Sequence, residues 1–292
     1  MQDQTTQSTR TIQIVECPRD AMQGWPYLIP TDQKIRYLNA LLQVGFHTLD
    51  FGSFVSAKVI PQMADSLEVL AQLDIAHSHT KLLAIVANLR GAQTAATQEK
   101  ITCIGYPFSV SPTFQLRNTH ASQEAALSLI DEMQELCLQH GKELVVYLSM
   151  GFGNPYGDPY NIDMLLHWTD IMAAKGISII SLADTVGLAK PGDIRTALQA
   201  LIPSYPEMTI GVHLHAAPDQ WQDKLRAAFQ AGCRRFDGAI GGIGGCPMAQ
   251  DALVGNLDTL HLLDFLGAEG STPGIDTRAL AVCRQLAMEI FH

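Results

Sequence analysis

The chain contains the stretch Thr209-Ile-Gly-Val-His213-Leu-His215, whose β-branched and apolar residues are typical of a short buried strand. Side chains along a strand alternate between its two faces, so His213 and His215 are predicted to point the same way. Two imidazoles close together on one rigid face make half of a divalent-metal site. The alternative is that the two histidines only fill ordinary core or surface positions. Further candidate ligands elsewhere in the chain would favour the metal site.

Seven further runs of the same kind lie along the chain and alternate with longer amphipathic segments. These predicted strands are Thr11–Val15, His47–Asp50, Lys81–Ala87, Ile101–Gly105, Leu144–Leu148, Ile177–Leu182 and Phe236–Ile240. The predicted helices are Asp32–Gln43, Gln62–Leu73, Gln123–His140, Met164–Lys175, Gly192–Leu201, Gln220–Gln230 and Gln250–Leu266. Thr31 and Asp32 stand where a helix N-cap belongs, and Gly141, Gly176 and Gly232 follow the last turns of three helices.

Eight strands, most of them followed by a helix, predict an α/β fold of the closed (β/α)8 or TIM barrel type. The barrel would form a single catalytic domain over residues 11–268, and residues 269–292 would add a helical extension with a helix at Asp276–Phe291. The alternative is an open doubly wound sheet. Such a sheet usually carries a glycine-rich phosphate turn after its first strand, and the segment Glu16–Pro26 has no G-x-G-x-x-G pattern.

The composition of the chain argues against several classes of function. Of its 292 residues, 47% are apolar and 16% are charged, and the net charge is −10 without any basic run. Such an acidic chain is a poor match for nucleic acid or for an anionic membrane surface. No N-terminal segment resembles a signal peptide, and no run reaches the ~20 apolar residues of a membrane span. The six widely spaced cysteines are predicted to be thiols, and the protein is predicted to be cytoplasmic.

In a TIM barrel, catalytic groups collect at the carboxyl ends of the strands and in the loops that follow. That rule selects polar residues after five of the predicted strands. They are Arg19 and Asp20 after the first strand, Asp50 at the end of the second, Asp184 after the sixth, His213 and His215 on the seventh, and Cys246 and Asn256 after the eighth. All of them are predicted to converge on one mouth of the barrel.

Four of these side chains form a candidate metal-ligand set. Asp20, His213, His215 and Asn256 offer a carboxylate oxygen, two nitrogens and an amide oxygen. This mostly hard set suits Mg²⁺ or Mn²⁺ and tolerates Co²⁺ or Zn²⁺, and substrate oxygens would fill the open positions. A cation lowers the pKa of a bound hydroxyl, and Asp20 could help to remove its proton.

Arg19 and Cys246 are the predicted partners of a reacting carbon–carbon bond. Arg19 would neutralise negative charge on a carbonyl that becomes enolate-like when the bond breaks, as in a retro-aldol or retro-Claisen reaction. Cys246, next to a stretch with four glycines in five residues, would donate a proton from a mobile flap. The alternatives are an ordinary turn around Cys246, a structural Arg19–Asp50 salt bridge, and a loop-capping role for Asp184.

Five segments, in this order, resemble the 3-hydroxy-3-methylglutaryl-CoA lyase family. They are Val15-Glu-Cys-Pro-Arg-Asp-Ala-Met-Gln23, Asp50-Phe-Gly-Ser-Phe-Val-Ser-Ala-Lys-Val-Ile-Pro-Gln-Met63, Ser181-Leu-Ala-Asp-Thr-Val-Gly187, Val212-His-Leu-His215, and Gly244-Gly-Cys-Pro-Met-Ala-Gln250 followed by Gly255-Asn-Leu257. The resemblance extends from about Ile12 to Leu266. The family belongs to a larger group of metal-dependent lyases and synthases on the same barrel, and the Ser-Phe-Val-Ser and Gly-Gly-Cys-Pro elements favour its lyase branch over isopropylmalate and homocitrate synthases.

The resemblance implies cleavage of 3-hydroxy-3-methylglutaryl-CoA to acetyl-CoA and acetoacetate, assisted by Mg²⁺ or Mn²⁺, in a homodimer. Its binding partners would be small acyl-CoA or 3-hydroxy-acid substrates, with neither nucleic acid nor membrane. The implied roles are metal binding by Asp20, His213, His215 and Asn256, catalysis by Arg19, Asp20, Asp50, His213 and Cys246, and substrate contact by Arg19, Gln23, Ser53 and Asp184.

The departures from the family pattern cluster around the substrate. Asp50 stands where the family usually has a glutamate, and Gly24 and Pro26 stand where an asparagine and a lysine are expected near CoA. Ala216 and Ala217 replace a polar pair after the histidines. The implied metal ligands and acid groups, in contrast, are retained.

Two other functions fit the same residues. An aldolase or acyl-CoA condensing synthase on this barrel would act on a different 3-hydroxy acid, although synthases of the group generally carry extra C-terminal domains. A barrel that binds metal and ligand without turnover is the alternative outside the enzymes, and the altered pocket positions keep it open.

Overall fold

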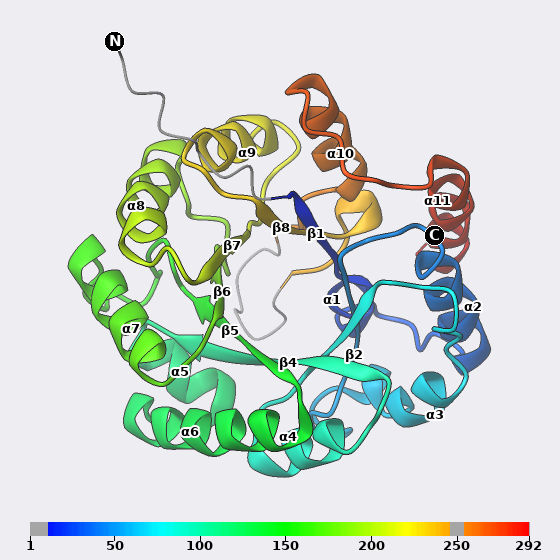
Figure 1. Ribbon diagram of the computed structural model, residues 1–292, viewed down its shortest axis with the longest axis horizontal. Coiled ribbons are helices and arrows are strands. Elements are labelled where there is room, and N and C mark those ends of the chain that lie inside the picture. The colour runs from blue at the N-terminus through cyan, green and yellow to red at the C-terminus, as the bar shows by residue number, and fades with distance from the viewer. Residues whose placement is uncertain (1–10, 246–253, 292) are drawn as a thin grey trace.

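Eight parallel strands close into a barrel, and helices surround it on the outside (Figure 1). The computed structural model describes residues 11–245 and 254–291. The strands are β1 Gln13–Glu16, β2 Thr48–Ser53, β3 Lys81–Ile85, β4 Ile101–Ser109, β5 Glu143–Ser149, β6 Ile179–Ala183, β7 Thr209–His213 and β8 Arg235–Gly238. Strands that are neighbours in the chain are neighbours in the barrel, and β1 pairs with β8 to close it. The predicted α/β TIM barrel is confirmed.

The helices that cover the barrel follow nearly every strand. They are α1 Pro18–Gln23, α2 Thr31–Leu41, α3 Ser66–Ala71, α4 Leu89–Ala96, α5 Pro112–Thr119, α6 Gln123–His140, α7 Ile162–Ala174, α8 Pro191–Ser204, α9 Trp221–Gln230, α10 Thr259–Ala268 and α11 Thr277–Ile290, with 3₁₀ turns η1 Pro61–Met63 and η2 Ile240–Gly242. None of the helices within the described ranges is long and apolar enough to cross a membrane.

The sequence analysis did not place α1, α4 and α5, and the last two of these helices are defined by their caps. The Asn88 side chain accepts a hydrogen bond from the backbone N–H of Gly91 at 2.9 Å, and the Ser111 hydroxyl accepts one from Phe114 at 3.1 Å. Each cap satisfies one of the N–H groups that the first turn of a helix leaves without an intrahelical partner. The predicted helix ends are confirmed at Gly141, Gly176 and Gly232, whose φ angles of 65°, 76° and 95° lie in the region that glycine adopts without steric cost.

Strand ends differ from the predicted ones where polar residues continue the ladder. β2 runs on to Ser53 through a register shift between Asp50 and Gly52, and β4 runs on to Ser109. β7, in contrast, ends at His213, because His215 leaves the parallel ladder and forms an antiparallel bridge with Asn256. His213 is therefore held by the parallel ladder, whereas His215 is held by its bridge to Asn256.

Two predicted helices have wrong boundaries. Within the described part of the segment predicted as the helix Gln250–Leu266, the helix begins at Thr259, and residues 250–253 lie outside the described residues. Residues 254–258 are not helical, because Leu257 donates to the carbonyl of Leu214 at 3.2 Å and Asp258 caps α10. The segment predicted as the helix Gln62–Leu73 is divided into η1 and α3.

The predicted N-cap at Thr31 and Asp32 is also wrong. Thr31 is the first residue of α2, and Pro30 occupies the cap position. The Thr31 hydroxyl donates to Asp65 at 2.8 Å instead of bonding to its own helix. A polar residue at a helix start can thus serve a neighbouring element, which the sequence pattern does not reveal.

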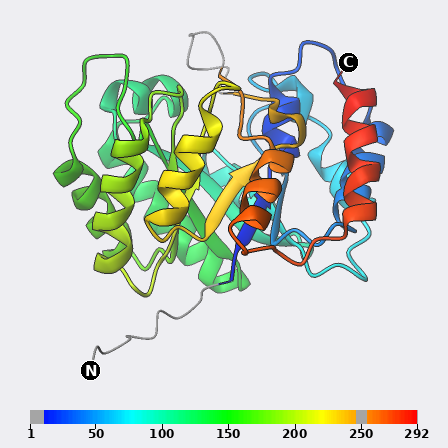
Figure 2. The ribbon, with the colours of Figure 1, turned by 90° about the horizontal axis from the view of Figure 1, so that it is seen from above.

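The C-terminal helix α11 packs against α2 on the outside of the barrel, as Figure 2 shows. Phe291, just after α11, is buried, and its ring meets Trp25 and Tyr37 edge-on with centroids 5.2 and 6.4 Å apart. Such aromatic pairs add to the stabilisation from buried area. The helix thereby supports the segment after α1, and the division into a barrel at 11–268 and an extension stays a prediction.

The carboxylate of Glu16, at the end of β1, links three parts of the barrel. It accepts hydrogen bonds from the backbone N–H of Ile240 at 2.9 Å and from the Thr259 hydroxyl at 2.5 Å. Burial raises the pKa of Glu16 to about 8, despite these two hydrogen bonds. Near neutral pH the folded protein therefore holds Glu16 as a neutral acid.

Replacing Glu16 with glutamine is expected to stabilise the protein at alkaline pH. Below about pH 4.5 the Glu16 carboxyl is protonated in both states, whereas between about 4.5 and 8 only the unfolded chain releases the proton, so wild-type stability falls as the pH rises. Glutamine can still accept from the N–H of Ile240 through Oε1, and its Nε2 can donate to the Thr259 hydroxyl, without this cost. We expect a gain of about 2–4 kcal/mol in the free energy of unfolding at pH 8 and little change at pH 4. Urea unfolding at both pH values measures this, and a variant less stable than wild type at pH 8 would contradict it.

Candidate active site

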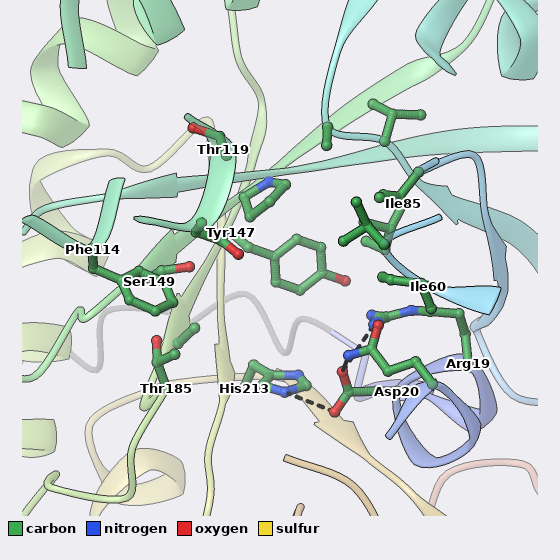
Figure 3. Close-up of a pocket in the computed structure, with 18 of the residues that line it drawn as sticks. Arg19, Asp20, Ile60, Ile85, Phe114, Thr119, Tyr147, Ser149, Thr185 and His213 are labelled. Atoms are coloured by element: carbon green, nitrogen blue, oxygen red, sulfur yellow. Dashed lines mark hydrogen bonds and ion pairs between the residues drawn. The ribbon is translucent and has the colours of Figure 1, made fainter. Parts of the chain in front are cut away.

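A cavity of about 280 Å³ opens at the carboxyl ends of the strands, and its two sides differ in chemistry (Figure 3). Polar groups from α1, from the end of β5, from the loop after β6 and from the end of β7 line one part of it. They include Arg19, Asp20, Gln23, Ser149, Thr185, His213 and His215. Apolar residues from the loop after β2 and from the end of β3 line another part, and Phe114 of α5 lies beside Ser149 and Thr185 (Figure 3). The apolar part includes Val55, Ile60, Ile85 and Val86.

The two histidines meet at the polar side with their Nε2 atoms facing each other. Nε2 of His213 lies 3.2 Å from Nε2 of His215 and 4.0 Å from Oδ2 of Asp20. Ligand atoms of these three residues all lie within 4.8 Å of one another. The prediction that His213 and His215 point the same way is confirmed, although β7 ends between them.

The other nitrogen of each ring has its own partner. Nδ1 of His213 lies 3.2 Å from Oδ2 of Asp237, and Asp237 in turn accepts from Arg235 at 2.9 Å. The His215 ring hydrogen-bonds to the backbone of Thr185. With Asp237 accepting the Nδ1 proton of His213, the neutral ring would present the lone pair of its Nε2 toward His215.

Among the charged groups around this space, the ionised carboxylate of Asp20 favours a cation. Burial would raise the pKa of Asp20, but the Arg19 guanidinium and the two imidazoles outweigh it and hold the pKa at about 2. Burial and the neighbouring His213 lower the pKa of His215 to about 4. Burial alone would lower the pKa of His213, but the hydrogen bond and charge of Asp237 raise it above the usual value. An ionised carboxylate and two imidazole nitrogens therefore fit a divalent cation.

Asn256, the fourth predicted ligand, lies beside this group. Its Nδ2 donates to Oδ2 of Asp20 at 2.8 Å and to the carbonyl of Ile243 at 2.9 Å. The amide therefore presents its nitrogen to Asp20 in this arrangement, whereas a metal ligand would present its oxygen. The structure brings Asn256 to the site, and its role as a ligand stays a prediction.

Arg19 is held between two carboxylates. Its Nε and Nη2 donate to Asp50 at 3.0 and 2.5 Å, and its Nη1 donates to Asp20 at 2.9 Å. Burial raises the pKa of Asp50 to about 6, although the Arg19 charge acts in the opposite direction. Asp50 is 1% exposed and is not among the residues lining the cavity, so it orients Arg19 from behind. Gln23 lines the cavity and donates to Asp20 at 2.8 Å.

Two predicted substrate contacts, Ser53 and Asp184, lie outside the lining of the cavity. The Ser53 hydroxyl donates to the carbonyl of Ile85 at 3.1 Å and accepts from the N–H of Val55 at 3.2 Å. Asp184 accepts from the N–H of Ala189 at 2.9 Å, which is the loop-capping alternative. Their substrate-binding roles stay predictions, and the structure shows both as supports for loops around the cavity.

The predicted flap cysteine, Cys246, lies outside the described residues. The chain just before it runs close to the candidate ligands. A Cβ added at Gly244 would lie 3.1 Å from Oδ2 of Asp20, and Gly244 has a φ of 116° that favours glycine. Of the six cysteines predicted to be thiols, the five that the structure describes are free and buried.

Sequence reasoning missed three residues that shape the site. Arg235 and Asp237 lie two positions apart on β8, so their side chains share a face of the strand. The predicted strand began at Phe236 and therefore did not include Arg235. The Tyr147 ring on β5 meets the His213 ring edge-on with centroids 6.1 Å apart, and its hydroxyl points across the cavity toward Arg19 (Figure 3). Burial raises the pKa of Tyr147 well above its usual value, so the phenol remains a hydrogen-bond donor.

The sequence matches the HMGL-like family over residues 11–287, nearly the whole chain. The chain belongs to the HMGL-like family. Within this family it is 31% identical over 268 residues to the rat cytoplasmic 3-hydroxy-3-methylglutaryl-CoA lyase, covering 91% of this chain and 77% of the rat protein. It is 32% identical over 249 residues to a hydroxymethylglutaryl-CoA lyase of Bacillus subtilis, covering 85% and 82% of the two chains.

Solved structures of HMGL-like proteins share the fold closely. An HMG-CoA lyase from Acinetobacter baumannii, solved with coenzyme A and 3-methylmalate, superposes with a TM-score of 0.88 at 29% identity, covering 97% of this chain and 92% of that one. The HMG-CoA lyase of Bacillus subtilis superposes with a TM-score of 0.89 at 29% identity, covering 96% and 93%. The resemblance inferred from the five motifs is confirmed at the level of the family.

Proposed function

We propose that this HMGL-like protein is a divalent-metal-dependent lyase that cleaves a carbon–carbon bond in a 3-hydroxy-acyl-CoA. The reaction that fits best releases acetyl-CoA and acetoacetate from 3-hydroxy-3-methylglutaryl-CoA. The observation that carries the proposal is the convergence of Nε2 of His213, Nε2 of His215 and Oδ2 of Asp20 beside the Arg19 guanidinium. Cation ligands and a positive group for a developing enolate thus line one cavity.

Asp20, His213 and His215 would hold the cation, with Asn256 as the further proposed ligand. A bound Mg²⁺ or Mn²⁺, or Co²⁺ or Zn²⁺ in their place, would polarise substrate oxygens and ease loss of the hydroxyl proton. Asp20 stays ionised and lines the cavity, so it can also accept a hydrogen bond from that hydroxyl. His213 keeps its orientation through Asp237 and presents Nε2 to the same space.

Arg19 would stabilise the negative charge that develops on the acyl carbonyl as the bond breaks. Its guanidinium is already desolvated and aligned by Asp50, so it needs little rearrangement when the charge appears. Gln23 lies beside Asp20 as a proposed substrate contact. Cys246 is proposed to protonate the enolate product, and the approach of Gly244 to Asp20 supports placing that segment near the reacting carbon.

The apolar side of the cavity would receive the non-reacting part of the substrate. Val55, Ile60 and Val86 offer it apolar surface, whereas Arg19 is the only lysine or arginine among the lining residues in the described ranges. Burying an alkyl group contributes about 0.8 kcal/mol per methylene. We propose that the alkyl substituent at C3 of the substrate contacts this apolar surface.

The proposal is tested by incubating the protein with 3-hydroxy-3-methylglutaryl-CoA, Mg²⁺ or Mn²⁺ and a reductant, and by measuring acetyl-CoA and acetoacetate. We expect both products in equal amounts. The free acid 3-hydroxy-3-methylglutarate and thioesters with a larger alkyl group at C3 serve as comparison substrates. If only one of these comparison compounds gave product, the proposed reaction would stand, but the proposed substrate would have to be replaced by that compound. Binding without product from any of them would support a non-catalytic barrel, and thiol release from acetyl-CoA and a 2-oxo acid would support a condensing synthase.

We further propose a cytoplasmic homodimer. Relatives in the comparison include proteins named as cytoplasmic and as mitochondrial, and the cytoplasmic lyases support the first part. Light scattering on the purified protein tests whether it is a homodimer.

A further inference from the structure

Lys224 on α9 is a charged residue that the proposed chemistry does not use. Its side chain is 3% exposed, and that of its partner Asp184 is 1% exposed. Nζ of Lys224 donates to Oδ2 of Asp184 at 2.7 Å, to the carbonyl of His215 at 2.7 Å and to the carbonyl of Gly187 at 3.1 Å. An ammonium has three donor hydrogens, so these acceptors use all of them. Lys224 therefore has no donor left for a substrate, and it does not line the cavity.

The same ion pair reaches both histidines of the candidate metal site. The backbone N–H of Asp184 donates to the carbonyl of His213 at 2.9 Å, while Lys224 holds the carbonyl of His215. Asp184 also begins the loop whose next residue, Thr185, hydrogen-bonds to the His215 ring. One buried Lys–Asp pair thus fixes two backbone carbonyls and one imidazole of the His-x-His segment.

His215 needs such support because β7 ends before it. The parallel ladder between β6 and β7 stops at the pair Ala183 and His213. The residues that flank His215 are bonded to the segment at Asn256, through Ala216 to Gly255 at 3.1 Å and Leu257 to Leu214 at 3.2 Å. The carbonyl of His215 itself is held by Lys224.

We propose that Lys224 is a positioning residue that sets the geometry of the metal site through the backbone of His215. The proposal rests on the proposed metal-binding function of Asp20, His213 and His215. Groups that orient metal ligands from behind typically change metal affinity 10–100-fold when they are removed. Replacing Lys224 with methionine keeps most of the side-chain volume but removes all three bonds.

Mn²⁺ binding to the purified, metal-free protein measures this role without relying on turnover. We expect the Mn²⁺ dissociation constant of Lys224→Met to rise about 10–100-fold over wild type in calorimetric titrations. Lys224→Arg keeps the charge but presents a planar fork to three differently placed acceptors, and we expect a smaller rise. A Lys224→Met dissociation constant within threefold of wild type would overturn the proposal.

Lys34→Met is the matched control. Lys34 is also buried, with its side chain 5% exposed, and pairs with Asp65 at 2.8 Å on the outer layer of the barrel. Both lysine variants leave a carboxylate without its lysine and should lose stability toward urea, but only Lys224→Met should lose Mn²⁺ affinity. Equal losses of affinity would overturn the proposal, because the effect would then follow from destabilisation alone.

A double variant covers the case in which Lys224→Met does not fold. Lys224→Met/Asp184→Asn leaves no unpaired buried charge, yet it still lacks the bond to the His215 carbonyl. We expect its Mn²⁺ dissociation constant to remain at least 10-fold above wild type, and a wild-type value would overturn the proposal. Absence of Mn²⁺ binding by the wild-type protein would instead contradict the proposed metal site itself, so the two failures are distinguishable.

Discussion

Replacing Arg19 with glutamine is expected to lower kcat about 10²–10³-fold, the cost of removing one preorganised group that stabilises a developing oxyanion. Arg19 is the one guanidinium among the cavity-lining residues that the structure describes, and Asp50 and Asp20 align it before substrate arrives. Its contribution should be largest when negative charge has developed, so kcat should fall more than KM rises. Steady-state kinetics with 3-hydroxy-3-methylglutaryl-CoA measure both constants.

The Arg19 variant should keep its metal. Removing a positive charge leaves Asp20 in a more negative surrounding, so the Mn²⁺ dissociation constant should stay within a few-fold of wild type or decrease. Arg226→Gln is the matched control, because Arg226 lies at the surface, where it pairs with Asp223. Retention of more than about a tenth of the wild-type kcat would show that Arg19 does not stabilise the charge that the mechanism assigns to it.

Replacing Asp20 with asparagine is expected to weaken Mn²⁺ binding by more than about 100-fold. Removing a group that only hydrogen-bonds to a metal ligand typically lowers metal affinity by about 10–100-fold, so the loss of a ligand should exceed that range. The change removes the one ionised carboxylate among the three closely spaced ligand groups. Cleavage should fall below detection. A ligand at about 100 times its dissociation constant stabilises the folded state by about 2.7 kcal/mol, so Mn²⁺ should raise the Tm of wild type and not that of the variant.

An exposed carboxylate provides the control for Asp20. Asp223→Asn changes the net charge by the same amount on the surface of α9, where Asp223 pairs with Arg226. It should leave the Mn²⁺-dependent rise in Tm intact. A normal Mn²⁺ response in Asp20→Asn would move the metal away from Asp20, for example toward the group formed by Cys17, His213 and Asp237 behind the His213 ring.

The barrel could be predicted because its strands are short apolar runs with helices between them. Strand ends were harder, because polar residues such as Ser53 and Ser109 continue the ladder at the mouth of the barrel. The start of α10 was missed because Leu257 bonds to Leu214, a partner more than forty positions away in the sequence. Tertiary pairing overrode the local helical pattern there.

The candidate site was predictable where ligands lie in one motif or at strand ends. His213, His215 and Asp20 come together as expected, and Arg19 meets Asp50. Lys224 could not be found in the same way, because a lysine on an amphipathic helix is usually solvated and its partners lie on other elements. Buried ion pairs depend on three-dimensional proximity, and a sequence pattern does not encode it.

Turnover of chelator-treated protein during stepwise addition of Mn²⁺ tests the central claim most directly. We expect no acetoacetate from 3-hydroxy-3-methylglutaryl-CoA in EDTA, and activity that rises in proportion to bound Mn²⁺ and levels off at one ion per chain. Full cleavage in the presence of EDTA by protein shown to hold no metal would contradict the account.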